Sequence, residues 1–130
     1  MTAITKEEQI KALAALLKPL GFKKRRTTWY LQTVDTIQAI NVQGSQWGPA
    51  YYLNVGTYLR ALGEESMPPE YRCHIRARIH PPERAAEILV QECQDWFKQF
   101  GTVASLITHS RNRTLPVFTT GAARTWLDDV

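Results

Sequence analysis

Hydrophobic positions near the start of the chain repeat with the period of a helix. Four apolar residues, spaced three and four apart, form one stripe: Ile10, Leu13, Ala14 and Leu17. This spacing predicts an amphipathic helix over residues 5 to 18. Thr5, followed three residues later by Glu8, has the form of a capping box, which marks a helix start. Pro19 and Gly21 are expected to end the helix.

From Thr27 to Leu59 the pattern changes to a period of two, with β-branched and aromatic residues typical of strands. It predicts three antiparallel strands, with turns near residues 34–35 and 44–50. With the second turn in that place, facing residues keep a constant sum of residue numbers. The predicted facing pairs are Ile40 with Val55, Asn41 with Asn54, Val42 with Leu53, and Gln43 with Tyr52.

The stretch YRCHIRARIH, residues 71 to 80, alternates regularly and predicts a fourth strand. Its apolar set is Cys73, Ile75, Ala77 and Ile79. Its polar set is Arg72, His74, Arg76, Arg78 and His80. Residues 83 to 100 follow two prolines and carry a helical stripe, which predicts a second amphipathic helix. Residues 103 to 110 fit a short helix or a strand, and the chain is expected to end in a short helix.

Together these patterns predict one α+β domain spanning residues 1 to 130. We expect a mainly antiparallel sheet of about four strands, with N-terminal and C-terminal amphipathic helices packed on one face. A chain of 130 residues is long enough to bury a single core.

The predicted register gives the sheet two different faces. The apolar face, which the helices cover, carries Trp29, Ile40, Val42, Leu53, Val55, Cys73, Ile75 and Ile79. The polar face carries Thr28, Tyr30, Asn41, Gln43, Tyr52, Asn54, Tyr58, Arg72, His74, Arg76 and Arg78. Gly56 lies in the middle of the polar face, where its missing side chain permits close approach of a ligand or another backbone. Alternatively, this face is simply solvated, or its arginines pair with carboxylates of a C-terminal segment that covers it.

Charge and composition narrow the function classes. Sixteen Lys and Arg against twelve Asp and Glu give a net charge of +4, which favours anionic partners. No segment is apolar enough for a membrane span, and the N-terminal pattern predicts a helix instead of an export signal. We therefore expect a cytoplasmic protein without a membrane partner. Cys73 and Cys93 form no Cys-x-x-Cys pattern, so we expect two buried, reduced thiols.

Metal and cofactor chemistry have little support in the sequence. His74 and His80 share a strand face but lie roughly 20 Å apart along an extended chain, too far to share one ion. We expect no metal and no cofactor. The polar face carries no predicted Asp or Glu, which paired-carboxylate catalysis requires, and Cys73 is expected to point to the apolar face. A small-molecule enzyme with His74 as its acid or base is retained as an alternative.

The sequence favours a non-catalytic binding module. The residues expected to form its recognition face are Asn41, Gln43, Tyr52, Asn54, His74, Arg76 and Arg78. The amides would fix the orientation of a ligand, and Arg76 and Arg78 would hold an anionic group bidentately. Single-stranded nucleic-acid binding is the second alternative, because Tyr30, Tyr52 and Tyr58 beside arginines are typical of a base-stacking surface.

Two aromatic residues near the second predicted turn, Trp47 and Tyr51, are of the type that anchors protein interfaces. Alternatively, Trp47 folds back onto the core. A protein or an anionic ligand is the expected partner, and the sequence leaves the oligomeric state open.

Three stretches carry a resemblance to a known family: LKPLGFKKRRTTWY, INVQGSQWGPAYYLNVGTYL and YRCHIRARI. Over residues 10 to 100 the chain resembles the domain of unknown function 4304, a family of small bacterial proteins. The shared motifs are Leu-Gly-Phe-Lys-Lys, Asn41 with Gln43 and Ser45, Asn54 with Gly56, and the Cys-His-Ile-Arg-x-Arg strand. The resemblance implies a bacterial α+β domain and supplies no reaction. The small size is also similar to that of immunity proteins, which block toxins delivered between bacteria.

Overall fold

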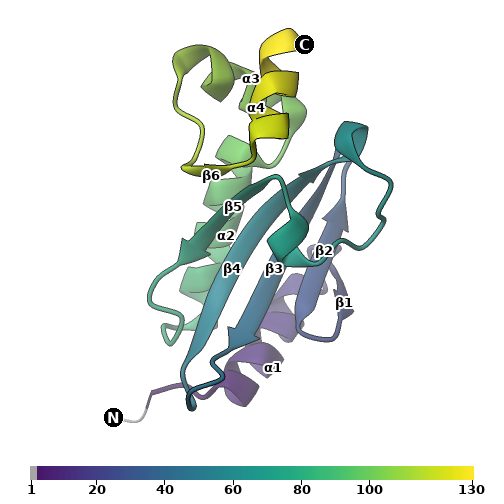
Figure 1. Cartoon of the computed structure of the whole chain (residues 1–130). Helices are drawn as coiled ribbons and strands as arrows, with labels where there is room; N and C mark the ends of the chain where they lie inside the picture. Colours follow the sequence, from purple (N-terminus) through teal and green to yellow (C-terminus); the bar gives the residue numbers. More distant parts are fainter. Residues whose placement is uncertain (1–2) are drawn as a thin grey trace.

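The computed structural model describes residues 3–130. Over this range the helices are α1 Lys6–Leu17, α2 Ala86–Phe100, α3 Val103–Asn112 and α4 Gly121–Asp129. The strands are β1 Lys23–Arg25, β2 Thr28–Gln32, β3 Thr36–Gly44, β4 Tyr51–Leu59, β5 Ile75–Ile79 and β6 Phe118–Thr119. Two 3₁₀ turns, η1 Arg60–Leu62 and η2 Glu70–Arg72, lie between β4 and β5 (Figure 1). None of the described helices combines the length and the apolar character that a membrane crossing requires.

The six strands form one antiparallel sheet in chain order, β1 to β6. The α+β class and the antiparallel sheet are therefore confirmed. The predicted register between β3 and β4 is also confirmed, since Asn41 faces Asn54 and Val42 faces Leu53. The sheet has two more strands than expected. β1 and β6 are only three and two residues long, too short to show an alternating pattern.

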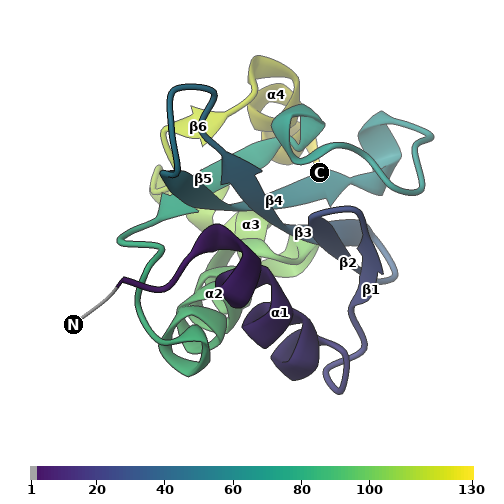
Figure 2. The ribbon, with the colours of Figure 1, turned by 90° about the horizontal axis from the view of Figure 1, so that it is seen from below.

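The apolar face of the sheet is covered by α1 and α2 (Figure 2), as predicted. The buried core between these layers comprises Leu13, Leu17, Phe22, Trp29, Ile40, Val42, Tyr51, Leu53, Val55, Ala86, Leu89, Val90, Cys93 and Phe97. The Thr5 hydroxyl accepts from the Glu8 amide at 3.2 Å, and the Glu8 carboxylate accepts from the Thr5 amide at 3.1 Å. This reciprocal pair is the predicted capping box, and it satisfies backbone donors at the start of α1.

The C-terminal region packs at one end of the sheet (Figure 1). Residues 103–112, which the sequence left open, form helix α3, and the predicted C-terminal helix is α4. The two helices bury a separate cluster with the ends of β4 and β5: Leu59, Ile75, Leu106, Ala123 and Leu127.

Part of the polar face is covered by residues 60–74, which cross it between β4 and β5 (Figure 1). Tyr30 and Tyr58 are only 6% and 4% exposed there, packed with Ala39 and Cys73. The expectation of an open tyrosine surface is therefore wrong, and Cys73 lies on this face instead of the apolar one. The missing side chain of Gly56 makes room for Cys73 on this face, because a Cβ at Gly56 would lie 2.7 Å from the Cβ of Cys73. The close approach predicted at Gly56 is made by the chain itself.

Candidate functional site

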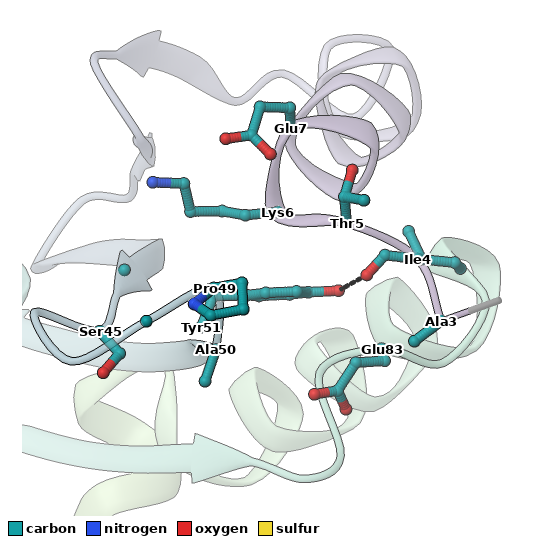
Figure 3. Close-up of a pocket in the computed structure, with 12 residues that line it drawn as sticks. Ala3, Ile4, Thr5, Lys6, Glu7, Ser45, Pro49, Ala50, Tyr51 and Glu83 are labelled. Carbon is teal, nitrogen blue, oxygen red and sulfur yellow. Dashed lines mark hydrogen bonds between the residues drawn. The ribbon is translucent and has the colours of Figure 1, made fainter.

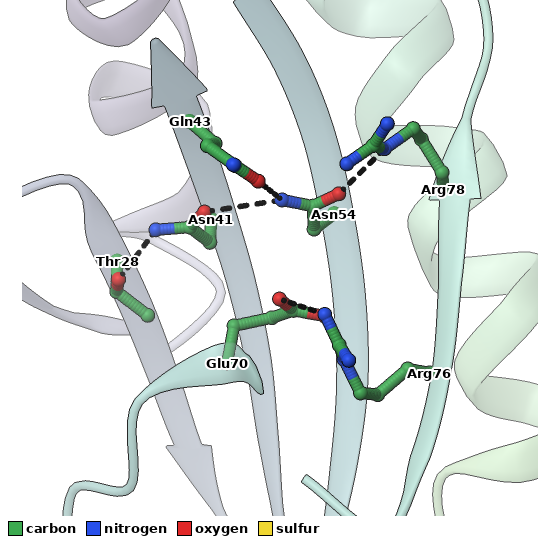
Figure 4. A network of polar contacts seen from close by, with 7 residues as sticks. All are labelled: Thr28, Asn41, Gln43, Asn54, Glu70, Arg76 and Arg78. Carbon is green, nitrogen blue, oxygen red and sulfur yellow. Dashed lines mark hydrogen bonds and ion pairs between the residues drawn. The ribbon is translucent and has the colours of Figure 1, made fainter. Parts of the chain in front are cut away.

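A chain of polar side chains crosses the uncovered part of the polar face, from β2 to β5 (Figure 4). Asn41 donates to the Thr28 hydroxyl at 2.9 Å. Asn54 donates to the side-chain oxygens of Asn41 at 3.3 Å and Gln43 at 3.0 Å. At the far end, Nε of Arg78 donates to the Asn54 side-chain oxygen at 3.0 Å. The predicted register brings these groups together because residues facing across an antiparallel pair share a face.

Arg78 determines which way each amide in this network points. A guanidinium has only donors, so Asn54 must present its oxygen to Arg78 and its nitrogen to Asn41 and Gln43. Asn41 and Gln43 must then present their oxygens to Asn54. The nitrogen of Asn41 reaches Thr28, whereas the nitrogen of the exposed Gln43 makes no hydrogen bond within residues 3–130. Each amide oxygen of the network therefore already accepts a hydrogen bond, whereas the Gln43 nitrogen is a free donor.

Arg78 itself is held at two points. Its guanidinium carbon lies 4.2 Å from the centre of the Tyr52 ring, a cation–π contact, and its Nε is fixed by Asn54. The two outer nitrogens, Nη1 and Nη2, have no hydrogen-bond partner in the described part of the chain, and the residue is exposed. Arg78 thus presents the fork that binds a carboxylate or phosphate bidentately, in a fixed orientation.

Arg76 is already paired. Its Nε and Nη2 donate to the two oxygens of Glu70 at 3.0 and 3.2 Å (Figure 4), and hydrogen bonding to Glu70 raises the pKa of Arg76. Glu70 is only 6% exposed. The expectation that no carboxylate lies on this face is wrong, because Glu70 comes from the η2 turn that covers it. The sequence signal was the Pro-Pro-Glu run at 68–70, where two prolines stiffen the approach.

His74 lies apart from this network. Its Nδ1 accepts from the backbone amide of Leu59 at 2.9 Å, and its ring packs on Tyr58 with centroids 4.7 Å apart. Burial lowers the pKa of His74. β5 begins only at Ile75, so the strand alternation that placed His74 beside Arg76 and Arg78 does not extend to it.

Two adjoining hollows lie over the network, of about 340 Å³ and about 560 Å³. Both are lined by Glu70, Arg76 and Arg78. The smaller one continues past His80 to Phe118 on β6, and the larger one runs over Asn41 and Gln43 toward Thr27 and Thr28 on β2. The free donors of the network therefore open into a continuous depression.

The two residues proposed for an interface differ in position. Trp47 is 87% exposed at the tip between β3 and β4, so the alternative that it covers the core is wrong. Tyr51 is buried, and its hydroxyl donates to the backbone oxygen of Ile4 at 2.7 Å (Figure 3). The interface hypothesis is therefore wrong for Tyr51. The register itself could have predicted this, since Tyr51 alternates with Leu53 and Val55 on the apolar face.

Another cavity, of about 650 Å³, lies between the start of α1 and the hairpin tip (Figure 3). Its charged residues have opposite signs: Lys6, Glu7 and Glu83. The described residues that line it form no connected set of polar side chains like that around Arg78. The β3–β5 network is for this reason the stronger candidate site.

Nucleophilic chemistry has little basis in these residues. Burial raises the pKa of Cys93 to about 12 and also raises the pKa of Cys73, so both thiols stay protonated. Among residues 3–130, no three His, Cys, Asp or Glu side chains are grouped to hold a metal ion. The groups that the β3–β5 network offers to a ligand are the hydrogen-bond donors of Arg78 and Gln43.

Comparison with known protein families matches residues 13–120 to the family described as Domain of unknown function (DUF4304). The match covers most of the chain, and the chain belongs to this family. Searches among curated proteins and among solved structures found no match. The resemblance drawn from the sequence motifs is thus confirmed, and the network of Figure 4 joins the residues that carried it, Asn41, Gln43 and Asn54.

Proposed function

We propose that this domain is a non-catalytic binding module of a bacterial cytoplasm that recognises an anionic group of its partner. The proposal rests chiefly on Arg78, whose two outer nitrogens are unpaired while its Nε is held by Asn54 and its guanidinium face is held against the Tyr52 ring. A preoriented guanidinium loses little conformational freedom when it binds. Gln43 adds a further free donor beside it, so an oxygen-rich ligand fits this site.

The binding residues proposed here are Asn41, Gln43, Tyr52, Asn54 and Arg78. Arg76 supports the site indirectly, because its charge is compensated by Glu70. A module of this kind blocks or recruits a partner by occupying it, as immunity proteins do.

For each alternative function, residues that it requires are buried or already engaged by other groups of the chain. An enzyme based on His74 requires a ring that exchanges protons with a ligand, and this ring accepts from the Leu59 amide and packs on Tyr58. A base-stacking surface needs exposed rings, and Tyr30 and Tyr58 are buried.

The test is an NMR titration of isotopically labelled protein with acetate and with inorganic phosphate. We expect saturable shifts of the side-chain signals of Arg78, Asn54 and Gln43, since both anions accept hydrogen bonds from the fork. Arg78→Ala should abolish the shifts at Asn54 and Gln43. Arg111→Ala, which removes the same charge from an exposed site on α3, should leave them unchanged. Shifts spread equally over all arginines, or equal shifts in both variants, would contradict the proposal.

A further inference from the structure

We propose that the outer edge of β5 at residues 77–79 binds an extended acidic segment of a partner protein as an added strand. The inference rests on the proposed function, because Arg78 supplies the charge that selects the segment. It adds the binding mode and the chemical class of the partner.

The edge is open because β6 is short. β6 pairs with β5 only at Ile75–Thr119 and Arg76–Phe118. Before these residues the chain turns away at Pro116, whose backbone oxygen accepts from the Thr119 hydroxyl at 2.7 Å and from Arg124 at 3.0 Å. Residues 77–79 therefore have no neighbouring strand on this side within the described chain (Figure 1).

The opposite edge of the sheet is protected in a way that this one is not. β1 consists of three exposed basic residues, Lys23–Arg25, and charged, short edge strands resist pairing with other chains. Residues 77–79 are Ala, Arg and Ile, with only one charge. Beside them Val117 and Phe118 are 85% and 70% exposed, which provides apolar contact at the point where an added strand would continue β6.

The charges at this edge select an acidic segment. The hollow of about 340 Å³ lies along it, between Phe118 and Asn54. Glu70 is bonded to both donors of Arg76 that face it, so Arg78 is the cation of this hollow that lacks a carboxylate. Neighbouring strands lie about 4.8 Å apart. The Arg78 fork lies on the β4 side of β5, against Asn54 and Tyr52. A Glu on the polar face of an added strand, and less readily the shorter Asp, therefore has to extend across β5 to meet it.

A second copy of the chain fits this edge less well. If residues 77–79 paired antiparallel with the same residues of another copy, Arg78 would face Arg78. Like charges directly opposite each other destabilise a strand pair. An acidic segment of a different protein removes this repulsion.

The experiment selects short random peptides against the full chain by display, and then synthesises the enriched sequences. We expect enriched peptides to carry Asp or Glu among β-branched residues, and to bind Arg78→Ala about tenfold more weakly or worse. Arg111→Ala should bind as wild type does. Successive peptide amides are then N-methylated one at a time. Methylation should weaken binding at every second position, because strand pairing uses every second amide. Amide hydrogen exchange should slow, when peptide is bound, at those amides of residues 77–79 that point to the open edge and not at those already bonded to β4.

Different outcomes separate the two proposals. Acidic peptides that depend on Arg78 but tolerate N-methylation, with unchanged exchange at residues 77–79, would overturn strand addition and leave the proposed function standing. Enrichment without an acidic preference or Arg78 dependence would overturn both. Three further outcomes would each overturn the acidic-segment proposal. In the first, the selection enriches no peptides over a control without protein, and in the second, the chain forms a dimer that is lost when this edge is blocked. The third outcome is that the protein binds random single-stranded oligonucleotides in preference to the peptides.

Discussion

Two arginines two positions apart in β5 differ in what their charges contact. Arg76 pairs with the buried Glu70, whereas Arg78 is stacked on Tyr52 with its outer nitrogens free. Strand alternation predicts that both side chains share a face, and they do. It carries no information on which of them a loop residue neutralises. That difference depends on where residues 60–74 fold, so the sequence predicted the members of the site better than their roles.

Arg76→Ala should lower the free energy of unfolding by about 1–3 kcal/mol, because it leaves the Glu70 carboxylate buried without its partner. Urea unfolding measures the change. Arg72→Ala is the matched control, since Arg72 also pairs with a glutamate, Glu65, but at an exposed position; it should change stability by less than about 0.5 kcal/mol. Equal effects of the two substitutions would contradict a stabilising role of the Arg76–Glu70 pair.

At the scale of elements, the long strands and amphipathic helices were predictable because each repeats its pattern over several periods. The segment over residues 60–74 was not, since its Gly and Pro content indicates a loop without indicating which surface it covers. Its burial of Tyr30, Tyr58 and Cys73 is a tertiary effect. β1 and β6 also depend on neighbouring strands for their conformation.

His74, at the end of residues 60–74, should make the free energy of unfolding depend on pH. Burial lowers its pKa in the folded protein, and its Nδ1 must stay unprotonated to accept from Leu59. Below the ordinary value of 6.5 the unfolded chain binds a proton that the folded chain does not. Stability is therefore full above about pH 6.5 and falls as the pH decreases toward the lowered folded pKa.

Urea unfolding across this pH range measures the effect. His74→Asn supplies the control, because the Asn side-chain oxygen can accept from the Leu59 amide and does not titrate in this range. The variant should lose the His74 part of the pH dependence. An unchanged pH profile in His74→Asn would mean that other groups cause it.

For the molecule as a whole, the helices and the covering segment leave one part of the sheet uncovered. α1 and α2 bury the apolar face, and residues 60–74 cover the part of the polar face that carries Tyr30 and Tyr58. The uncovered part carries the network centred on Arg78. The free donors of this network and the unpaired edge of β5 adjoin each other. The proposed recognition of an anionic, extended partner rests on this arrangement.

The proposed function requires that Arg78 is oriented before any ligand binds. The most direct test is ¹⁵N relaxation at Nε of Arg78 in the free protein, compared with Nε of Arg111. We predict that Arg78 has an order parameter approaching the value of about 0.85 typical of rigid backbone, and that Asn54→Ala lowers it. A mobile Arg78, indistinguishable from Arg111 in the wild type, would contradict the account.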